Sequence, residues 1–234
     1  KLPRTTVHEL LGTLAERRYL VLLPGQPQRY QLGVRLFQLG NIYADQLDLA
    51  REARREAGEV AAACDETVHV AILEGRDVIY IARVDSTHPV RMVSAIGRRL
   101  PAHCTGVGKM LLSDQPPEAL DALYPRNSTL PVMTPNSISS VSRLRKALIE
   151  IGESGLSYDD GESTEDVRCL AAGVRDSSGE MVAAMSISVP TMRWTDAVRE
   201  ELSDLVRAGA LRLSGSLGYR EPHSTPGMLD ARGR

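Results

Sequence analysis

The sequence predicts an α+β fold, in which a largely antiparallel sheet is bracketed by helices and follows a small helix-and-hairpin unit. Two observations lead to this prediction. Apolar residues alternate with a period of two between residues 67 and 84, as in a pair of half-buried strands, and they recur at helical spacing before and after this stretch. The chain of 234 residues is long enough for one medium domain and a smaller one.

Charge is unevenly distributed along the chain. The net charge is −2, but residues 1–35 hold six basic and two acidic residues, so this segment is +4 and the remainder is −6. A basic segment beside an acidic body is typical of a nucleic-acid contact confined to one module. No apolar run reaches about 18 residues, so we expect no membrane span. Three widely spaced cysteines fit no zinc pattern, which favours a reducing cytoplasm and predicts neither metal nor cofactor.

Residues 1–33 predict the second half of a winged helix-turn-helix. A helix extends to about Arg18, and two short strands at 19–23 and 29–32 flank a turn rich in Pro and Gly. In such a unit the helix enters the major groove and the hairpin touches the flanking DNA backbone. An ordinary amphipathic helix is the alternative. Because the unit cannot bury its apolar face alone, we expect that preceding helices are missing. The expected DNA contacts are Arg4, Thr5, Thr6, His8 and Arg29.

Residues 34–65 predict linker helices. The first segment has a broad apolar stripe to about Gln46, and the second, from Leu49 to Ala63, is charged on one face and rich in Ala on the other. Two interpretations are equally open. The second helix packs against its copy in a dimer, or it lies on its own domain.

Residues 66–218 predict the main domain, and a polar tail at 219–234 is expected to be mobile. Thr195 is expected to cap the last long helix. The expected strands are 67–72, 78–84, 90–95, 156–160, 166–174 and 181–189, and the expected helices begin near residues 106, 116, 140 and 196.

The stretch from Gly97 to Leu112 predicts an anion site at the start of a helix. Thr105 can cap a helix that begins at Gly106, and the small first turn leaves backbone N–H groups uncovered at the positive end of the helix dipole. The stretch is neither a Walker A loop nor a dinucleotide fingerprint, because His103, Met110 and Leu111 stand where those motifs require other residues. The alternative is a helix that opens with glycine and simply packs on a sheet.

Three segments resemble the IclR family of bacterial transcriptional regulators. Residues 2–14 are similar to its recognition helix, residues 100–109 to its central pocket motif, and residues 155–162 with 167–172 to its second signature. The resemblance covers about residues 1–218. It implies a winged-helix DNA-binding domain, a linker helix and a GAF-like effector domain. The implied partners are a double-stranded DNA operator, a small organic or aromatic acid as effector, and further copies of the chain in a dimer or tetramer.

The resemblance also implies which residues contact the effector. The chemistry of these residues is compatible with that role, since Ser186 and Ser188 share one face of a strand and could bind a carboxylate. Asp159 beside an acid is favourable only if it accepts a ligand hydroxyl or holds a proton, which favours an acid with a hydroxyl, keto or hydrated aldehyde group. The alternative is that these are plain small sheet residues. The implied effector residues are Met92, Leu100, Gly106, Val107, Asp159, Val167, Cys169, Ser186 and Ser188.

A DNA-binding repressor controlled by an effector is therefore the expected function, and two other functions remain open. One is a ligand-sensing module without DNA binding, because Glu9 and Gly12 stand where the family often has Arg. The other is an enzyme that uses Cys104 or Cys169 as nucleophile. Against an enzyme, His103 is adjacent to Cys104 in sequence, and adjacent residues point apart.

Overall fold

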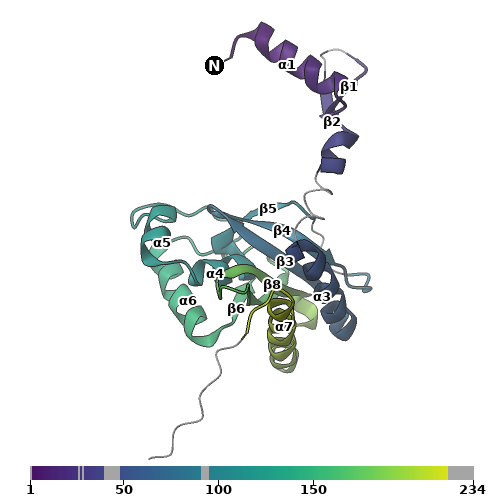
Figure 1. Cartoon of the computed structure of the whole chain (residues 1–234). Coiled ribbons are helices and arrows are strands. Elements are labelled where there is room, and N and C mark those ends of the chain that lie inside the picture. Colours follow the sequence, from purple (N-terminus) through teal and green to yellow (C-terminus); the bar gives the residue numbers. More distant parts are fainter. Residues whose placement is uncertain (1, 26, 28, 40–47, 91–94, 221–234) are drawn as a thin grey trace, which may run out of the picture. The chain divides into compact units, whose positions relative to one another are not determined.

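Two units divide the chain, residues 1–51 and residues 52–234. The computed structural model describes residues 2–25, 27, 29–39, 48–90 and 95–220 (Figure 1). The expected linker segment 40–47 and the expected tail beyond residue 220 lie outside the described residues. None of the described helices is both long and apolar enough to span a membrane.

The first unit contains the expected helix and hairpin. Helix α1 spans Arg4–Glu16, and strands β1 (Leu20–Leu23) and β2 (Arg29–Leu32) pair antiparallel. Pro3 lies at the N-cap of α1. Gly33 closes the hairpin against the carbonyl of Arg18, where a β-carbon would lie 2.1 Å from the oxygen, so only glycine fits. Residues 34–39 are helical, as expected.

The second unit is built on a six-stranded antiparallel sheet with the order β5-β4-β3-β8-β7-β6. The two central strands, β3 and β8, come from opposite ends of the domain sequence. Their bounds are β3 Thr67–Glu74, β4 Asp77–Val84, β5 Arg99–Pro101, β6 Ser157–Asp160, β7 Val167–Arg175 and β8 Met181–Pro190.

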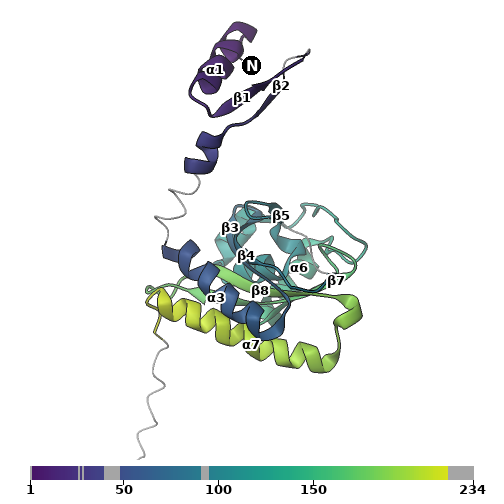
Figure 2. The same cartoon turned by 90° about the vertical axis from the view of Figure 1, so that its right-hand side faces the viewer.

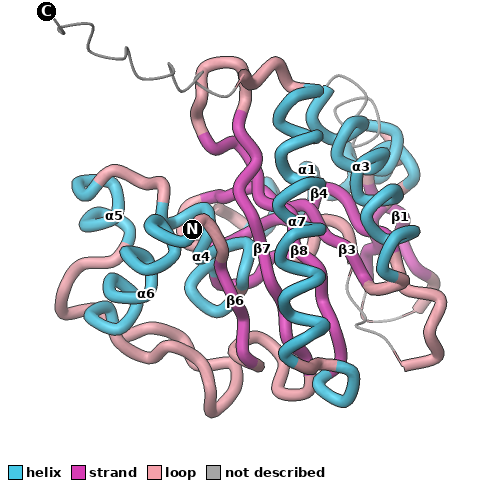
Figure 3. The backbone as a smooth tube through the Cα atoms, turned by 90° about the horizontal axis from the view of Figure 1, so that it is seen from below, coloured by secondary structure: helices cyan, strands magenta, loops and turns pink. Residues whose placement is uncertain are grey.

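Helices cover both faces of this sheet. Helices α3 and α7 lie side by side on one face (Figure 2), and α4 packs on the other face with α6 against it. Figure 3 shows the same arrangement from below. The bounds of the helices are α3 Asp48–Cys64, α4 Gly106–Ser113, α5 Pro117–Leu123, α6 Val141–Ser154 and α7 Asp196–Ser216.

The linker helix α3 lies on its own domain along its Ala-rich face. Ala53, Ala57 and Val60 are fully buried. A β-carbon at Gly209 of α7 would lie 2.5 Å from Cγ2 of Val60, so the two helices approach closely at a glycine. This contact matches the second of the two interpretations of the helix. Beside it, the buried carboxylate of Glu56 accepts a hydrogen bond of 3.0 Å from Nε of Arg212.

Thr105 caps α4 as expected, because its hydroxyl accepts a hydrogen bond from the amide of Gly108 at 3.0 Å. Gly108 itself is required by packing, since a β-carbon there would lie 2.2 Å from the carbonyl oxygen of Ala102. Thr195 caps α7 in the same way.

One expected strand is wrong in its described parts. Val90 lies in a bend and Ala95 is not in a strand, while residues 91–94 lie outside the described residues. The short strand β5 comes later and pairs with β4. The physical reason at Val90 is that its carbonyl accepts a hydrogen bond from the side chain of Arg193 instead of a strand partner.

Candidate functional site

The expected DNA-contacting residues are largely accessible in the first unit. Arg4, Thr5 and His8 are exposed on the first two turns of α1, whereas Thr6 is partly buried. Arg29 is exposed at the start of β2, next to the turn of the hairpin. The side chains that would reach base edges therefore lie on the helix, and the hairpin carries a separate cation.

The sheet face beneath α4 has an apolar part and a polar part. Ala71, Ala171 and Ala184 belong to the main apolar core, together with Val107 of α4. Beyond the N-terminus of α4, the same face carries small polar and titratable side chains that are buried. We define these six residues as the polar patch: Thr67, His69, Asp159, Cys169, Ser186 and Ser188.

The strand register assembles the polar patch. Asp159, Cys169, Ser188 and Thr67 lie opposite one another in turn across β6, β7, β8 and β3. Ser186 is two residues before Ser188, so both side chains lie on the same face, and Ser186 is opposite His69. Four of the residues that the sequence analysis assigned to the effector are thus brought together.

Hydrogen bonds join members of the patch. The thiol of Cys169 donates to the hydroxyl of Ser188 at 3.2 Å, and the Ser188 hydroxyl is 3.4 Å from Nδ1 of His69. The ring of His69 lies 4.6 Å from that of Tyr80. Burial lowers the pKa of His69 to about 4, so the imidazole is neutral at pH 7. The place of His69 beside Ser188 was not predicted, because register between distant strands cannot be read from sequence.

Neither buried cysteine is prepared to act as a nucleophile. Burial raises the pKa of the Cys169 thiol and also that of the Cys104 thiol, so both stay protonated at neutral pH. His103, which follows Ala102 and precedes Cys104, has its Nε2 2.9 Å from the carbonyl of Pro131. Neither thiol is therefore in the thiolate form that attacks as a nucleophile.

The first turn of α4 supplies two backbone donors next to the patch. A β-carbon on Gly106 would lie 3.6 Å from that of Ala171 and 3.8 Å from that of Cys169, so the helix starts directly over β7. Gly106 and Val107 are buried. Among the described residues, no hydrogen bond uses their amides, whereas the next two amides bond to Thr105. Buried amides without partners are costly, and they mark a place where an acceptor can bind.

The carboxylate of Asp159 already accepts three hydrogen bonds. They come from the amide of Glu162 at 2.6 Å, the amide of Ser163 at 3.3 Å and the hydroxyl of Ser163 at 2.6 Å. Burial is the largest influence on this carboxyl and raises its pKa, although the hydrogen bonds act in the opposite direction. Asp159 thus closes the turn after β6, and the predicted bond to an effector hydroxyl would add to these three.

A buried ion pair beside Asp159 was missed by sequence analysis. Nζ of Lys109 on α4 bonds to Glu162, and both side chains are at least nine-tenths buried. The second oxygen of Glu162 is buried and has no hydrogen-bond partner among the described residues. Burial raises the pKa of Glu162. The one available signal was a lysine within the apolar run of a buried helix, but its partner is 53 residues away.

Two further expected effector residues, Leu100 and Val167, are not members of the patch. Leu100 is in the main apolar core opposite Val78, three strands from β8 in the sheet order. Val167 packs with Cys169 in a separate small cluster. Met92 lies outside the described residues.

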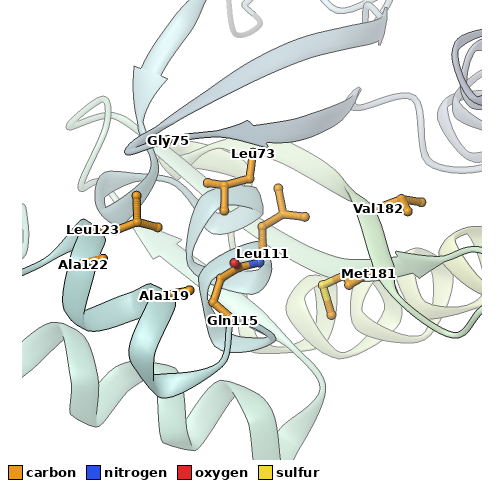
Figure 4. Close-up of a pocket in the computed structure, with 9 residues that line it drawn as sticks. All are labelled: Leu73, Gly75, Leu111, Gln115, Ala119, Ala122, Leu123, Met181 and Val182. Carbon is orange, nitrogen blue, oxygen red and sulfur yellow. The ribbon is translucent and has the colours of Figure 1, made fainter.

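One hollow lies near the N-terminus of α4, and a second lies near its C-terminus. One, of about 340 Å³, is lined partly by Asp159, Cys169 and Trp194, the one tryptophan in the sequence. The other, of about 460 Å³, lies at the far end of α4 between Leu111, Gln115 and α5 (Figure 4). The second is mainly apolar and includes none of the expected effector residues. In the described part of the chain, no group of His, Cys, Asp or Glu is arranged to hold a metal ion.

Comparisons with known proteins identify the class to which this architecture belongs. A sequence model described as bacterial transcriptional regulator IclR C-terminal matches residues 41–215. The HTH-type transcriptional regulator KdgR of Escherichia coli K12 is 32% identical over 222 residues, which cover 93% of this chain and 82% of KdgR. The HTH-type transcriptional repressor AllR of Salmonella typhimurium LT2 is 31% identical over 221 residues, 94% of this chain and 80% of AllR.

A solved structure agrees with these sequence relatives. The putative transcriptional regulator RHA06195 from Rhodococcus sp. RHA1 is 29% identical with a TM-score of 0.80, and the match covers 92% of this chain and 85% of that one. The chain belongs to the IclR family of bacterial transcriptional regulators, which confirms the resemblance seen in its sequence.

Proposed function

We propose that this regulator is a repressor that binds an operator in double-stranded DNA as a homodimer or homotetramer in the cytoplasm. We propose further that a small organic or aromatic acid controls this binding from the polar patch. The family membership and the exposed side chains of α1 support the first part. An isologous dimer would place two copies of α1 on a pseudo-palindromic site.

The unpaired amides of Gly106 and Val107 are the observation that carries the second part. They are buried, they lie at the positive end of the α4 dipole, and they adjoin the patch residue Cys169. A carboxylate that accepts from both amides would satisfy the two donors at once. Charge-assisted bonds of this kind are about twice as strong as neutral ones.

The patch also limits the chemistry of the rest of the ligand. The hydroxyls of Ser186 and Ser188 can each donate one hydrogen bond, and the neutral imidazole of His69 adds no positive charge. Asp159 accepts bonds and its oxygens can each take more than one donor. An acid that also carries a hydroxyl, keto or hydrated aldehyde group has a partner for each of these groups.

A ligand screen followed by calorimetry tests the acid site. The whole protein is screened by thermal shift against pyruvate, lactate, glyoxylate, benzoate and 4-hydroxybenzoate, and Trp194 fluorescence serves as a second signal beside the patch. We expect Ser188→Ala to weaken the bound acid about tenfold to a hundredfold, because one acid oxygen loses a charge-assisted bond.

Ser139→Ala is the matched control, because Ser139 is an exposed serine in the loop before α6. It should bind the acid as the wild type does. Wild-type affinity in Ser188→Ala would place the ligand elsewhere and would return the serines to the role of plain sheet residues. Failure of every acid to shift the melting temperature would count against an acid as the effector class.

A further inference from the structure

Hydrogen bonds hold the turn that joins the linker helix α3 to the sheet against residues 86–90. Asp65 occupies this turn with a φ of +51°. Its carboxylate accepts hydrogen bonds from the amide of Thr87 at 2.8 Å and from the Thr87 hydroxyl at 2.7 Å. The hydroxyl of Ser86 donates to the carbonyl of Asp65 at 2.6 Å. Movement of this turn would therefore displace residues 86–88 through these hydrogen bonds.

Arg193 joins the same two segments from a third element. Its Nε and Nη2 donate to the two carboxylate oxygens of Glu66 at 2.6 and 2.7 Å, and its Nη1 donates to the carbonyl of Val90 at 2.9 Å. Glu66 is 6% exposed, so this fork is held largely out of water. One guanidinium thus connects Glu66, two residues after α3, with the segment that follows β4 and with the short helix Thr191–Arg193 after β8.

Two of the three connected elements, β8 and the segment at Val90, adjoin proposed effector residues, and the third, α3, is connected to the proposed DNA-binding unit. Strand β8 carries Ser186 and Ser188 and ends at Pro190, three residues before Arg193. Val90 lies two residues before Met92 in the sequence, which is an expected effector contact. Helix α3 is the linker on the path of the chain from the DNA-binding unit to the sheet.

A hollow of about 480 Å³ adjoins the hydrogen bonds between the turn and residues 86–88. It is lined by small residues of α3 and by Asp65, Asp85 and Thr87. The turn and the segment beside it therefore have free space on one side, into which a small displacement could occur without a clash.

We propose that Arg193 is a positioning residue that couples the effector site to the linker helix. This inference rests on the proposed function. An effector bound next to β8 and Val90 would shift Arg193, and the two bonds from Arg193 to Glu66 would pass this shift on to α3. Because coupling between two sites is reciprocal, a coupling that runs through Arg193 predicts that DNA binding at the other end of the linker changes residues 86–90. The inference can therefore be tested before any effector is known.

Lysine is the informative substitution at this position. Arg193→Lys keeps the positive charge, but an ammonium group cannot form the two parallel bonds to Glu66 and also reach the Val90 carbonyl in the same planar geometry. The matched control is Arg143→Lys on the exposed face of α6. Glu66→Gln is the second variant, which preserves the shape of the partner and removes its charge.

The test measures amide hydrogen exchange in the whole protein with and without DNA. The protein first selects a binding duplex from a random-sequence pool, and this duplex is the probe. The amides of Ser86, Thr87 and His88 all donate hydrogen bonds, so their exchange rates report how often these hydrogen bonds open. In the wild type and in Arg143→Lys, we expect the duplex to change their exchange by about fivefold or more.

In Arg193→Lys the duplex should change exchange at these amides by less than about twofold, while α3 still responds. A role in stability alone would shift exchange without DNA and leave the duplex-induced change intact. A wild-type response in Arg193→Lys and Glu66→Gln would overturn the inference, as would a wild-type protein that binds the duplex without any response at residues 86–88. Failure to select any duplex would instead contradict the proposed function itself.

Discussion

His69 shows how one residue of the polar patch links folding to pH. Its imidazole is fully buried and burial lowers its pKa to about 4, whereas an unfolded histidine titrates near 6.5. The unfolded chain therefore binds more protons between these values. The stabilisation that comes from the neutral imidazole is complete above pH 6.5 and is lost as the pH falls towards 4.

Replacing this residue should flatten the pH dependence of stability. Between pH 7 and pH 5 the wild type should lose about 2 kcal/mol of unfolding free energy through His69, because the group is protonated only after unfolding. His69→Gln should lack this loss, as measured by urea denaturation at the two pH values. An equal loss in both proteins would mean that His69 is accessible to protons in the folded state.

The buried pair of Lys109 and Glu162 makes a second prediction for single residues. Lys109→Met leaves the Glu162 carboxylate buried without its partner, and such a change costs about 3–5 kcal/mol. Lys146→Met is the control, because Lys146 forms an exposed pair with Glu150 at 3.9 Å and should change stability by less than about 0.5 kcal/mol. Urea denaturation at pH 7 distinguishes them. Similar midpoints for both variants would contradict the buried pair.

The residues of the site were only partly predictable. Gly106 and Thr105 were predicted because capping depends on adjacent residues, and the shared face of Ser186 and Ser188 follows from the period of a strand. The pair of Lys109 and Glu162 depends on how the turn after β6 folds over α4. Contacts between residues so far apart are set by tertiary packing, to which sequence periodicity is insensitive.

Individual elements were predicted well where their sequence pattern is local. The hairpin of β1 and β2, the cap of α4 and the long helix α7 all follow from turn residues, capping residues and apolar spacing. The strand expected at residues 90–95 was wrong in its described parts because a side-chain bond from Arg193 holds Val90 in a bend. Such a bond leaves no trace in the apolar pattern of the segment.

Helix α1 and the hairpin should contribute differently to DNA binding. Arg4→Ala should cost about 1–3 kcal/mol of operator affinity and relax base preference if Arg4 contacts a guanine in the major groove. Arg29→Ala should weaken all sequences alike, because the hairpin would contact the backbone. Fluorescence anisotropy with the operator and a scrambled duplex measures both effects. Unchanged operator affinity in the two variants would contradict the placement of α1 in the groove.

For the whole molecule, the sequence predicted the fold class but not the strand order. The alternating segments identify an antiparallel sheet, and the helical segments identify its covering layers. The pairing of β3 with β8 joins strands more than a hundred residues apart, so it could not be read from local patterns. That pairing is what places His69 next to Ser188, and so it determines the composition of the polar patch.

One titration measures whether an acid at the start of α4 controls operator binding. Operator affinity is measured by anisotropy while the acid identified in the thermal-shift screen is added to wild type and to Ser188→Ala. Both proteins should bind the operator equally without acid. The wild type should then release it, and Ser188→Ala should need about tenfold to a hundredfold more acid for the same release. If both proteins released the operator at the same acid concentration, control by an acid at the start of α4 would be contradicted.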